Sequence, residues 1–456
     1  MIALGLGSNC GDRLRFLRKA IHQLKSPWVS PRIEVKSLSP IYESDALLPE
    51  GAPPDWNRSF LNLALICETS FSPSQLLAHI KRIENSIGRI QRGRWAPREI
   101  DIDILAFDSL IRETEELNIP HRSLMERPFV MLPFADLVPH WRNPGQDSSE
   151  YSIGQWVAPW KRKPPESVPF QTRRSTHTLT ELVGIINVTP DSFSDGGAFL
   201  SADAAFAQAN RLISQGARIL DVGAESTRPG ATPVSPNEEW NRLHPVVEAL
   251  QSAKREASSP VYLSIDTRHS DVATQAIQMG ADWINDVSGF ENPEMCHAVL
   301  NSEVDLVMMH SLSVPPRKGL ELPPDCDPIS VLLEWAEKRI AEIEKLGIAR
   351  ERIIFDPGIG FGKTPAQSWE IFRRAGEFQK LGTRILVGHS RKSFLSSLTP
   401  LTDLSPESRD FETIAITCSL AKSGVDFLRV HHIEGNSRGL KAWSQIDGVV
   451  ECGPTG

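Results

Sequence analysis

The sequence predicts an α/β protein in two parts: an N-terminal ferredoxin-like α+β domain followed by a (β/α)8 TIM barrel. Two observations carry this prediction. The first part of the chain alternates apolar and polar residues in strand-like segments, with stretches of helical periodicity between them. After residue 178, eight short apolar runs recur, separated by helical stretches, which is typical of parallel strands buried on both faces. A chain of 456 residues is long enough for both domains.

The N-terminal part contains five clear elements. Strands are expected at 2–8, 60–68 and 98–107, and helices at 12–24 and 72–88. Ser72 is a good N-cap for the second helix, because its hydroxyl can accept a hydrogen bond from a free backbone N–H of the first turn. This order of elements suits an antiparallel sheet covered by helices.

The eight apolar runs of the second part lie at 182–189, 217–224, 261–267, 282–288, 305–310, 352–358, 384–390 and 426–432. Each run ends in polar residues, and active sites of (β/α)8 barrels lie at the carboxyl ends of the strands. Between the two parts, the stretch 161–177 is polar, contains prolines and has no periodicity. We therefore predict a first domain at 1–160, a linker at 161–177 and a barrel at 178–456.

Composition narrows the class of protein. The formal charge of −8, with both signs mixed along the chain, argues against a general nucleic-acid surface but allows a local cluster of cations for a phosphate ligand. The six cysteines are scattered and form no C-x-x-C pair, so we expect reduced thiols and no zinc site. No basic, apolar leader and no run long enough to cross a bilayer is present, which predicts a cytoplasmic protein that binds no membrane.

Two glycine-rich segments resemble nucleotide motifs only in part. The segment 5–10 has Cys10 where a dinucleotide fingerprint needs its third glycine, and the segment 358–364 misses the P-loop spacing by one residue. Neither predicts a nucleotide fold. Glycines at 358–362 still allow backbone to approach a flat ligand closely.

A pair of carboxylates marks the first candidate site. Asp101 and Asp103 lie two apart in an alternating strand, so both project from one face. Such a pair is typical of Mg²⁺ sites beside phosphates, although a D-x-D pair alone is more often a solvated surface. Arginines upstream favour a nucleoside triphosphate over that alternative; they are Arg89, Arg92, Arg94 and Arg98.

Around these residues the sequence resembles the 6-hydroxymethyl-7,8-dihydropterin pyrophosphokinase family. The matching segments are GLGSN at 5–9, FLN at 60–62, RIENSIGR at 82–89, RWAPREIDIDIL at 94–105 and IPHRSLMERPFVMLP at 119–133. They follow the family's order and span nearly all of residues 1–140. The resemblance implies ATP as donor and transfer of its terminal pyrophosphoryl group to the hydroxymethyl oxygen of the pterin.

The same resemblance implies roles for individual residues. Asp101 and Asp103 would bind two Mg²⁺ ions and, with Arg98, form the catalytic group. Contacts to ATP are expected from Glu84, Arg89, Arg98, His121 and Arg127. The pterin ring is expected between two aromatic rings with one amide at its edge, from Phe60, Phe129 and Asn62. Aromatic faces and a few directed hydrogen bonds suit a flat heterocycle, although ordinary core packing would explain the two phenylalanines equally well without the resemblance.

The second part resembles the dihydropteroate synthase family over roughly residues 178–450. The matching segments follow the predicted strands, at 184–197, 221–231, 264–267, 285–289, 356–364, 387–393 and 429–432. The resemblance implies condensation of dihydropterin methyl pyrophosphate with p-aminobenzoate and release of pyrophosphate. That chemistry needs cations for the leaving group and a slot for p-aminobenzoate that keeps water away.

Here too the resemblance implies residue roles. Asn187 would bind the Mg²⁺–pyrophosphate. The catalytic and pyrophosphate-binding cations are expected to be Arg228, Lys392, Arg429 and His431. The buried pterin would be bound by Asp266, Asn285, Asp356 and Lys392. The slot for p-aminobenzoate would be bordered by Phe193, Thr227, Pro229, Phe361 and Ser393.

Some residues depart from the two families or have plainer interpretations. The segment between Arg89 and Trp95 looks shorter than in single-domain relatives, which leaves Arg92 and Arg94 without an assigned role. His432 stands where relatives usually carry an acid, and its role is open. Asp221, inside a predicted strand, is interpreted as a backbone anchor, and His310 as a residue of the barrel rim.

Two other functions are weighed against the bifunctional enzyme. A pterin-binding methyltransferase barrel would keep the fold, but methyl transfer leaves the predicted cluster Arg228, Lys392 and Arg429 without a pyrophosphate to neutralise. A non-catalytic domain kept as a scaffold is opposed by the intact Asp101 and Asp103 pair. The expected ligands are ATP, the hydroxymethyl pterin and p-aminobenzoate, with Mg²⁺ in both domains. The resemblance also implies a homodimer through the barrel.

Overall fold

The computed structural model describes residues 1–26, 30–93, 95–145, 151–162, 171–188, 201–225, 233–317, 319–398, 405–446 and 448–452. The chain divides into two compact units, which are described separately. Unit 1 comprises Met1–Leu179, Lys422–Gly424 and Lys441–Gly456, and unit 2 comprises Thr180–Ala421 and Val425–Leu440. Among the residues described, no helix combines the length and the apolar character that a bilayer crossing requires.

Unit 1 is built on an antiparallel sheet. Its main path runs β17–β2–β4–β1–β5, and β3 links β4 to β8. The strands are β1 (Ile2–Ser8), β2 (Ile33–Leu38), β3 (Tyr42–Ser44), β4 (Phe60–Thr69), β5 (Asp101–Phe107), β8 (Thr172–Arg174) and β17 (Val450–Glu451). A separate two-stranded sheet is formed by β6 (Arg112–Glu113) and β7 (Asn118–Ile119).

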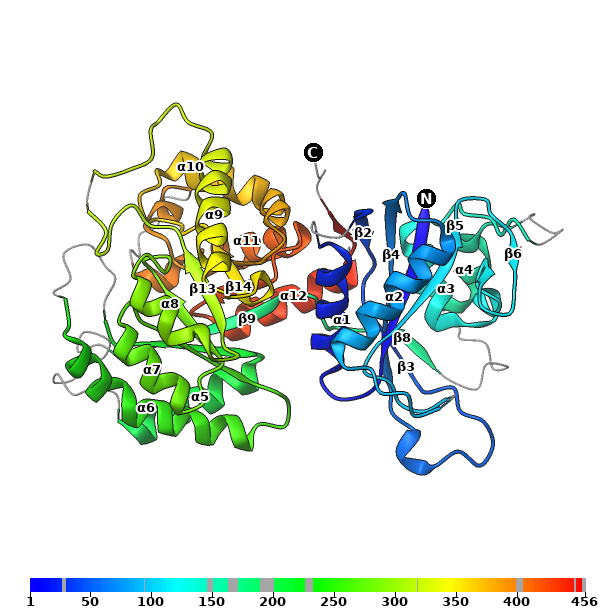
Figure 1. Ribbon diagram of the computed structural model, residues 1–456, viewed down its shortest axis with the longest axis horizontal. Coiled ribbons are helices and arrows are strands. Elements are labelled where there is room, and N and C mark those ends of the chain that lie inside the picture. Colours follow the sequence, from blue (N-terminus) through cyan, green and yellow to red (C-terminus); the bar gives the residue numbers. More distant parts are fainter. Residues whose placement is uncertain are drawn as a thin grey trace. The chain divides into compact units, whose positions relative to one another are not determined.

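Helices cover both faces of this sheet (Figure 1). One core joins the sheet to α1 (Arg13–Leu24) and α2 (Pro73–Ile87), and the other joins it to α3 (Pro128–Leu137) and α4 (Ile153–Arg162). Short 3-10 turns lie at Pro54–Trp56 and Leu124–Glu126. Alternation along β1 explains the two cores, because Leu4 belongs to the first and Ala3 to the second. The predicted elements and the α+β class are confirmed.

The start of α2 follows from its sequence. Ser72 accepts a hydrogen bond from the backbone nitrogen of Gln75, whose side chain in turn accepts from the Ser72 nitrogen. This capping box satisfies two backbone donors that the helix itself leaves free. The helix ends at Gly88, whose φ of 99° is a left-handed conformation that glycine adopts without steric cost. The helix therefore presents Glu84, in its last turn, at a fixed position.

Unit 2 is a closed barrel of eight parallel strands, in the order β10–β11–β12–β13–β14–β15–β16–β9. The strands are β9 (Glu181–Asn187), β10 (Ile219–Gly223), β11 (Tyr262–Asp266), β12 (Trp283–Asp286), β13 (Asp305–Met309), β14 (Ile353–Asp356), β15 (Arg384–Val387) and β16 (Phe427–Val430). Each of the eight apolar runs thus forms one barrel strand, and the predicted (β/α)8 fold is confirmed.

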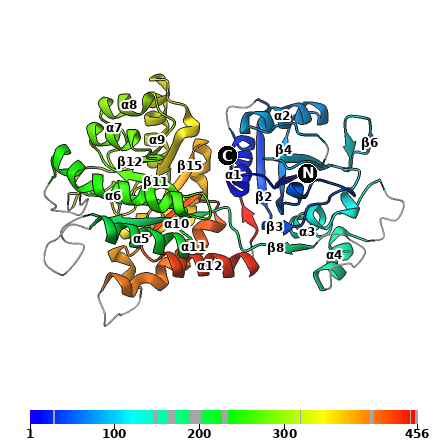
Figure 2. The same cartoon turned by 90° about the horizontal axis from the view of Figure 1, so that it is seen from below.

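A helix follows each barrel strand, and several are seen outside the strands in Figure 2. They are α5 (Ala202–Gln215), α6 (Pro236–Glu256), α7 (Ser270–Gln278), α8 (Pro293–Leu300), α9 (Pro328–Lys345), α10 (Pro365–Arg374), α11 (Asp410–Lys422) and α12 (Ile433–Ile446). Among the described residues, 3-10 segments also lie at Arg350–Arg352, Ala375–Leu381, Ser393–Ser397 and Pro406–Arg409.

The division of the chain differs from the predicted boundaries. The range 161–177, predicted as a linker, contains β8, which pairs antiparallel with β3, with Ser44 opposite Thr172. The range 178–456, predicted as the barrel, ends in β17, which pairs with β2 in unit 1. Both strands are too short to be recognised from periodicity. β17 and β8 form because β2 and β3 each have an edge whose backbone N–H and C=O groups would otherwise lack hydrogen-bond partners in the sheet.

Deleting residues 447–456 removes β17 and uncovers the edge of β2. We expect the local stability of unit 1 to fall by about 1–3 kcal/mol, because Val450, now only 6% exposed, loses its buried contacts and the two-residue ladder is lost. Hydrogen exchange of the β2 amides measures the loss. A deletion of 453–456 leaves β17 in place and is the control. Equal exchange in both variants would contradict a stabilising role for β17.

Candidate functional sites

Unit 1 contains a cavity of about 190 Å³ between β1, β4, β5 and the start of α3. The predicted residues that line it are Phe60, Asn62, Arg98, Asp101, Asp103, Arg127 and Phe129. Gly7 of β1 also lines the cavity, and a Cβ added there would lie 3.0 Å from Asn62 Oδ1 and 3.6 Å from the Phe60 ring. Glycine at this position therefore leaves room for the amide and the ring.

The two carboxylates of β5 meet at this cavity. Asp101 Oδ2 lies 2.5 Å from Arg98 Nη1, and its Oδ1 lies 2.9 Å from Arg89 Nη1. Burial, with the nearby charge of Asp101, raises the pKa of Asp103 to about 7, although Lys81 and Arg127 oppose the shift. Carboxylates crowded in this way favour a bound cation. Over the described part of the chain, no group of three or more His, Cys, Asp or Glu residues forms a metal cage by itself.

The other predicted nucleotide residues do not line the cavity. Glu84 is 1% exposed, and its Oε1 accepts from the Ile102 backbone nitrogen at 2.9 Å while its carboxylate pairs with Lys81 and Arg89. Glu84 is thus placed to hold Arg89 rather than to contact a ligand. His121 is partly buried, and burial followed by the charge of Arg127 lowers its pKa to about 4. It is therefore a neutral ring near pH 7.

The predicted pterin-binding residues are held by their neighbours. Asn62 Nδ2 donates to Ser44 Oγ at 3.0 Å, which fixes the amide orientation. The guanidinium of Arg127 lies 5.9 Å from the centre of the Phe129 ring, within the range of a cation–π contact. Trp95, at a left-handed φ of 70°, also borders the cavity.

Arg92 pairs with Glu99 at 2.6 Å, and Arg94 lies outside the described residues.

In unit 2, the alternation of each strand places an apolar layer inside the barrel with a polar layer above it. The apolar layer is formed by Val183, Ile219, Trp283, Val307, Ile354, Leu386 and Phe427, with Tyr262 against it. Two residues further along several of these strands, the side chain on the same face is polar. These residues are Asp221, Ser264, Asn285, Asp356 and Arg429. Three predicted site residues, Asn285, Asp356 and Arg429, are therefore brought together from distant parts of the sequence.

Arg429 is the centre of the polar layer. Its Nη1 lies 3.1 Å from Asp221 Oδ2 and 3.8 Å from Asp266 Oδ2, and its Nη2 lies 3.8 Å from Asp356 Oδ2. Burial by itself would lower the pKa of Arg429, but the three carboxylates together raise it above the ordinary value. Burial raises the pKa of Asp266 and Asp356, which the charge of Arg429 partly offsets. Four strands thus share one charge cluster.

Two acceptors in this cluster have no hydrogen-bond partner among the residues described. They are Asn285 Oδ1 and Asp356 Oδ2, both buried. A buried acceptor without a donor is costly, so its presence points to a ligand that supplies N–H groups. Asn285 Nδ2 is oriented by Asp221 Oδ2 at 3.4 Å, and Asp356 Oδ1 accepts from the Gly358 nitrogen at 2.8 Å.

Lys392 lies beside the same cluster. Its Nζ is 5.3 Å from the centre of the Phe361 ring, and a Cβ added at Gly360 would lie 3.6 Å from that nitrogen. Burial and the charge of Arg429 lower the pKa of Lys392 to about 8, against the opposing effect of Asp356. The amine is therefore still charged near pH 7. The structure places Lys392 over the ring of Phe361.

The remaining predicted residues lie at strand ends or outside the described residues. Asn187 ends β9 and is exposed, opposite Gly223 of β10. Ser393 and His431 are exposed after β15 and β16. Phe193, Thr227, Arg228 and Pro229 belong to the ranges 189–200 and 226–232, which are outside the described residues.

Sequence reasoning misjudged or missed two buried charged residues. Asp221 was expected to anchor backbone, but its carboxylate accepts from Ser264 Oγ at 2.6 Å and pairs with Arg429. Asp221 follows Ile219 by two residues in a strand, so both side chains point into the barrel. This alternation could have identified Asp221 from the sequence. Lys363, in the rejected P-loop segment, is buried with Nζ 2.7 Å from His310 Nδ1 and 3.0 Å from the carbonyl oxygens of His310 and Phe361. His310, the first residue after β13, is thus a buried partner of this lysine at the rim of the barrel.

The fold and the two sites define the class of protein: a pterin-binding barrel enzyme carried on one chain with a second, phosphate-handling domain. Family models agree with this class. The model described as 7,8-dihydro-6-hydroxymethylpterin-pyrophosphokinase matches residues 3–139, and the model described as pterin binding enzyme matches residues 183–431.

Relatives align over nearly the whole chain. The folate synthesis bifunctional protein of Chlamydia muridarum is 39% identical over 97% of this chain and 98% of its own length. A folate synthesis bifunctional protein of Arabidopsis thaliana is 32% identical over 95% of this chain and 93% of its own. The chain therefore belongs to the family of bifunctional folate synthesis proteins.

Solved structures resemble the barrel. Dihydropteroate synthase from Anaplasma phagocytophilum, with bound 6-hydroxymethylpterin-monophosphate, aligns with a TM-score of 0.53 and 36% identity, over 59% of this chain and all of its own. The synthase from Xanthomonas albilineans, in complex with 7,8-dihydropteroate, aligns with a TM-score of 0.52 and 33% identity, over 60% and 95%.

Replacing Asp221 with asparagine keeps the shape of the side chain but removes a buried charge beside Arg429. We expect unit 2 to lose about 1–3 kcal/mol of its free energy of unfolding, because the guanidinium keeps its desolvation cost with one carboxylate fewer. Urea unfolding of the full chain measures this loss. Glu370→Gln, which removes a surface pair with Arg373, is the control and should change stability by less than about 0.5 kcal/mol. Equal losses in both variants would refute the assignment.

Proposed function

We propose that the chain catalyses two consecutive steps of folate synthesis. Unit 1 transfers pyrophosphate from ATP to 6-hydroxymethyl-7,8-dihydropterin, and unit 2 condenses that product with p-aminobenzoate to give 7,8-dihydropteroate and pyrophosphate. The proposal rests on one observation: this single chain contains two sites whose charged groups can bind phosphate. One is a cavity with two carboxylates and two arginines, and the other is a barrel mouth with Lys392 and Arg429.

In unit 1, the cavity supports binding of a flat pterin next to a nucleotide. Phe60 and Phe129 supply aromatic faces and Asn62 a fixed amide. Arg98 and Arg127 are placed to neutralise phosphate oxygens, with Arg89 in support. These groups align acceptor and donor, which is sufficient for a transfer that needs no covalent intermediate.

Asp101 and Asp103 would hold Mg²⁺ in this cavity. The fit rests on their shared face of β5 and on the raised pKa of Asp103, which a nearby cation would relieve. When bound, the metal would supply positive charge that offsets the charge developing on the phosphates. In unit 2, Asn187 is the corresponding candidate for a Mg²⁺–pyrophosphate complex.

In unit 2, the polar layer supports binding of the pterin and release of pyrophosphate. The free acceptors of Asn285 and Asp356 match the N–H donors of an aminopyrimidine edge. Lys392, Arg429 and His431 supply cationic or donor groups for the leaving pyrophosphate. Phe361 and Ser393 are proposed to border the p-aminobenzoate slot, together with Phe193, Thr227 and Pro229, and Arg228 would add a further cation.

The alternatives are less well supported. A methyltransferase reaction would leave the fixed cations Lys392 and Arg429 without a developing charge to stabilise, and the matched barrels of known structure are dihydropteroate synthases. A degenerate domain is opposed by the assembly of both sites. The homodimer through the barrel and the cytoplasmic location stay predictions; the side chain of Phe411 on α11, 84% exposed, is compatible with a barrel interface.

Substitutions in one site should silence one reaction and spare the other. Asp103→Asn is expected to lower pyrophosphoryl transfer by at least about 100-fold while dihydropteroate formation from supplied pterin pyrophosphate is unchanged, because only the first step uses the β5 carboxylates. Lys392→Ala should do the reverse. Separate assays of the two steps on each full-length variant measure this. Loss of both reactions in either variant would contradict two independent sites.

The pKa of Asp103 predicts a pH dependence for metal binding in unit 1. A carboxyl group with a pKa of about 7 must lose its proton before it binds Mg²⁺, so affinity rises with pH through that value. Between pH 6 and pH 8 we expect about tenfold tighter binding of Mg²⁺ with a non-hydrolysable ATP analogue, measured by titration calorimetry. Asp103→Asn should abolish this dependence. An unchanged affinity over this range would rule out Asp103 as the titrating ligand.

A further inference from the structure

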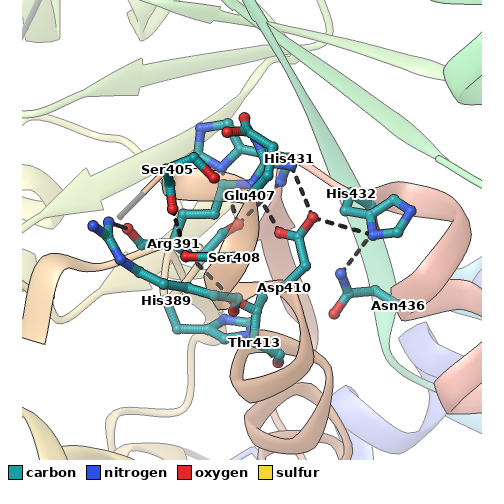
Figure 3. Close-up of polar contacts among 12 residues, drawn as sticks. His389, Arg391, Ser405, Glu407, Ser408, Asp410, Thr413, His431, His432 and Asn436 are labelled. Atoms are coloured by element: carbon teal, nitrogen blue, oxygen red, sulfur yellow. Dashed lines mark hydrogen bonds and ion pairs between the residues drawn. The ribbon is translucent and has the colours of Figure 1, made fainter. Parts of the chain in front are cut away.

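The loop that follows β15 meets the end of β16 beside His431, in the neighbourhood drawn in Figure 3. Ser390 belongs to this loop. Its Oγ lies 3.2 Å from the backbone nitrogen of His431 and 2.9 Å from Nδ1 of the same residue. Ser390 is buried, whereas His431 is solvent-exposed. One buried hydroxyl therefore holds both the backbone and the ring of an exposed histidine.

The carboxylate of Asp410, on α11, contacts Arg391 and His432, the residues that follow Ser390 and His431 in the chain. Asp410 accepts from Arg391 Nε at 2.8 Å and from Arg391 Nη2 at 2.9 Å, and its Oδ2 lies 3.3 Å from His432 Nδ1 (Figure 3). Glu407 adds a second contact, 2.7 Å from Arg391 Nη1. Asp410 thus lies between the loop after β15 and the end of β16, hydrogen-bonded to Arg391 and close to His432 Nδ1. His432 is the residue that stands where relatives usually carry an acid.

The backbone next to Ser390 is constrained as well. Arg391 adopts a φ of 56°, a left-handed conformation that is uncommon for a residue with a side chain. Its nitrogen donates to Thr413 Oγ1 at 3.2 Å, and its carbonyl oxygen accepts from Arg409 Nη1 at 3.0 Å. A conformation of this kind persists only where its surroundings hold it. Ser390 is therefore fixed in front of His431 by contacts on several sides.

The hydrogen bonds of Ser390 decide which ring nitrogen carries the proton. A serine hydroxyl has one proton to donate and two lone pairs that accept. The backbone N–H of His431 can only donate, so it takes up one lone pair of Ser390 Oγ. Among the described residues, His431 Nδ1 is the one acceptor that the hydrogen bonds give to the Ser390 proton. With Nδ1 protonated, Ser390 Oγ would accept twice and its own proton would have no acceptor among these residues. The arrangement that satisfies the buried hydroxyl therefore leaves Nδ1 unprotonated and places the proton of the neutral ring on Nε2.

The charges around His431 keep the ring neutral. The groups that face it are Arg391, Lys392, Arg429 and Asp410. Desolvation, followed by these three cations, lowers the pKa of His431 to about 4, and Asp410 opposes the shift only in part. Solvent weakens the desolvation because the side chain is exposed, but the cations act in the same direction. Near pH 7 the ring is a neutral donor and not an additional cation.

We propose that Ser390 is a positioning residue that holds His431 as the Nε2–H tautomer, so that this nitrogen donates a hydrogen bond to the leaving pyrophosphate. The identity of the ligand rests on the proposed function, whereas the tautomer rests on the geometry of Ser390. The opposite tautomer would turn a lone pair towards an anion and repel it. By orienting the ring, Ser390 therefore lets His431 donate a hydrogen bond to the pyrophosphate instead of repelling it.

The test uses the full chain labelled with ¹⁵N-histidine, in which His431→Gln identifies the His431 signals. Ring ¹⁵N shifts should show the Nε2–H tautomer in the parent protein and a mixture in Ser390→Ala. In that variant we expect the affinity for inorganic pyrophosphate to fall about fivefold, as for one lost hydrogen bond. The kcat of dihydropteroate formation should fall with it, while KM for p-aminobenzoate stays constant.

Matched variants separate the hydroxyl from the shape of the side chain. Ser390→Thr and Ser390→Val have nearly the same volume, but only threonine keeps the hydroxyl and is expected to keep the Nε2–H tautomer and the affinity. Ser397→Ala, which removes an exposed hydroxyl bonded to the Phe394 carbonyl, should change nothing. In the His431→Gln background, Ser390→Ala should cost little more, because both changes remove the same interaction.

Three results would overturn the proposal: a proton on Nδ1 in the parent protein, an unchanged tautomer in both Ser390→Ala and Ser390→Val, or additive losses from Ser390→Ala and His431→Gln. The failure of the proposed reaction is a distinct result. If the parent protein made no dihydropteroate while tautomer and pyrophosphate affinity responded as expected, the reaction would be wrong and the positioning role would stand.

Discussion

The guanidinium of Arg429, enclosed by three carboxylates inside a barrel, is the interaction on which the second site depends. Each acid alone would be costly at this depth, and the cation alone would be too. Together they are tolerated because Asp221, Asp266 and Asp356 lie 3.1–3.8 Å from one Arg429 side chain. The cluster also leaves acceptors without donors, at Asn285 and Asp356. A site of this kind is organised before its ligand arrives, which is what a ligand with matching N–H groups requires.

The two units differ in how their charged groups would meet phosphate. In unit 1, burial and the charge of Asp101 raise the pKa of Asp103, and the proposed Mg²⁺ would relieve this crowding beside Arg98 and Arg127. In unit 2, Lys392 and Arg429 lie next to Asp356, the residue proposed to bind the pterin. This difference suits the order of the two proposed steps. The first would bind a nucleotide together with its metal, and the second would stabilise a pyrophosphate as it leaves.

The sheet of unit 1 includes two strands, β8 and β17, that lie outside residues 3–139, the range that the pyrophosphokinase family model matches. β8 pairs with β3, whose Ser44 orients Asn62 in the cavity, and β17 pairs with β2. The segment expected to link two independent domains therefore supports a strand that borders the first site. The sheet edges of the first unit are therefore covered by residues that lie beyond its matched range in the sequence.

By itself, the sequence determined the α+β domain and the eight barrel strands, because alternation and helical periodicity are local properties. It also nominated the strand ends as the active face of the barrel. Local signals also placed Asp101 and Asp103 on one face. Only the tertiary structure decided that Glu84 is buried and paired with Arg89, and that Asp221 pairs with Arg429. It alone also decided that Lys363 is buried against His310 and that β8 and β17 complete the first sheet. Those features depend on contacts between residues far apart in the chain, and no local pattern records which buried charges will share a partner.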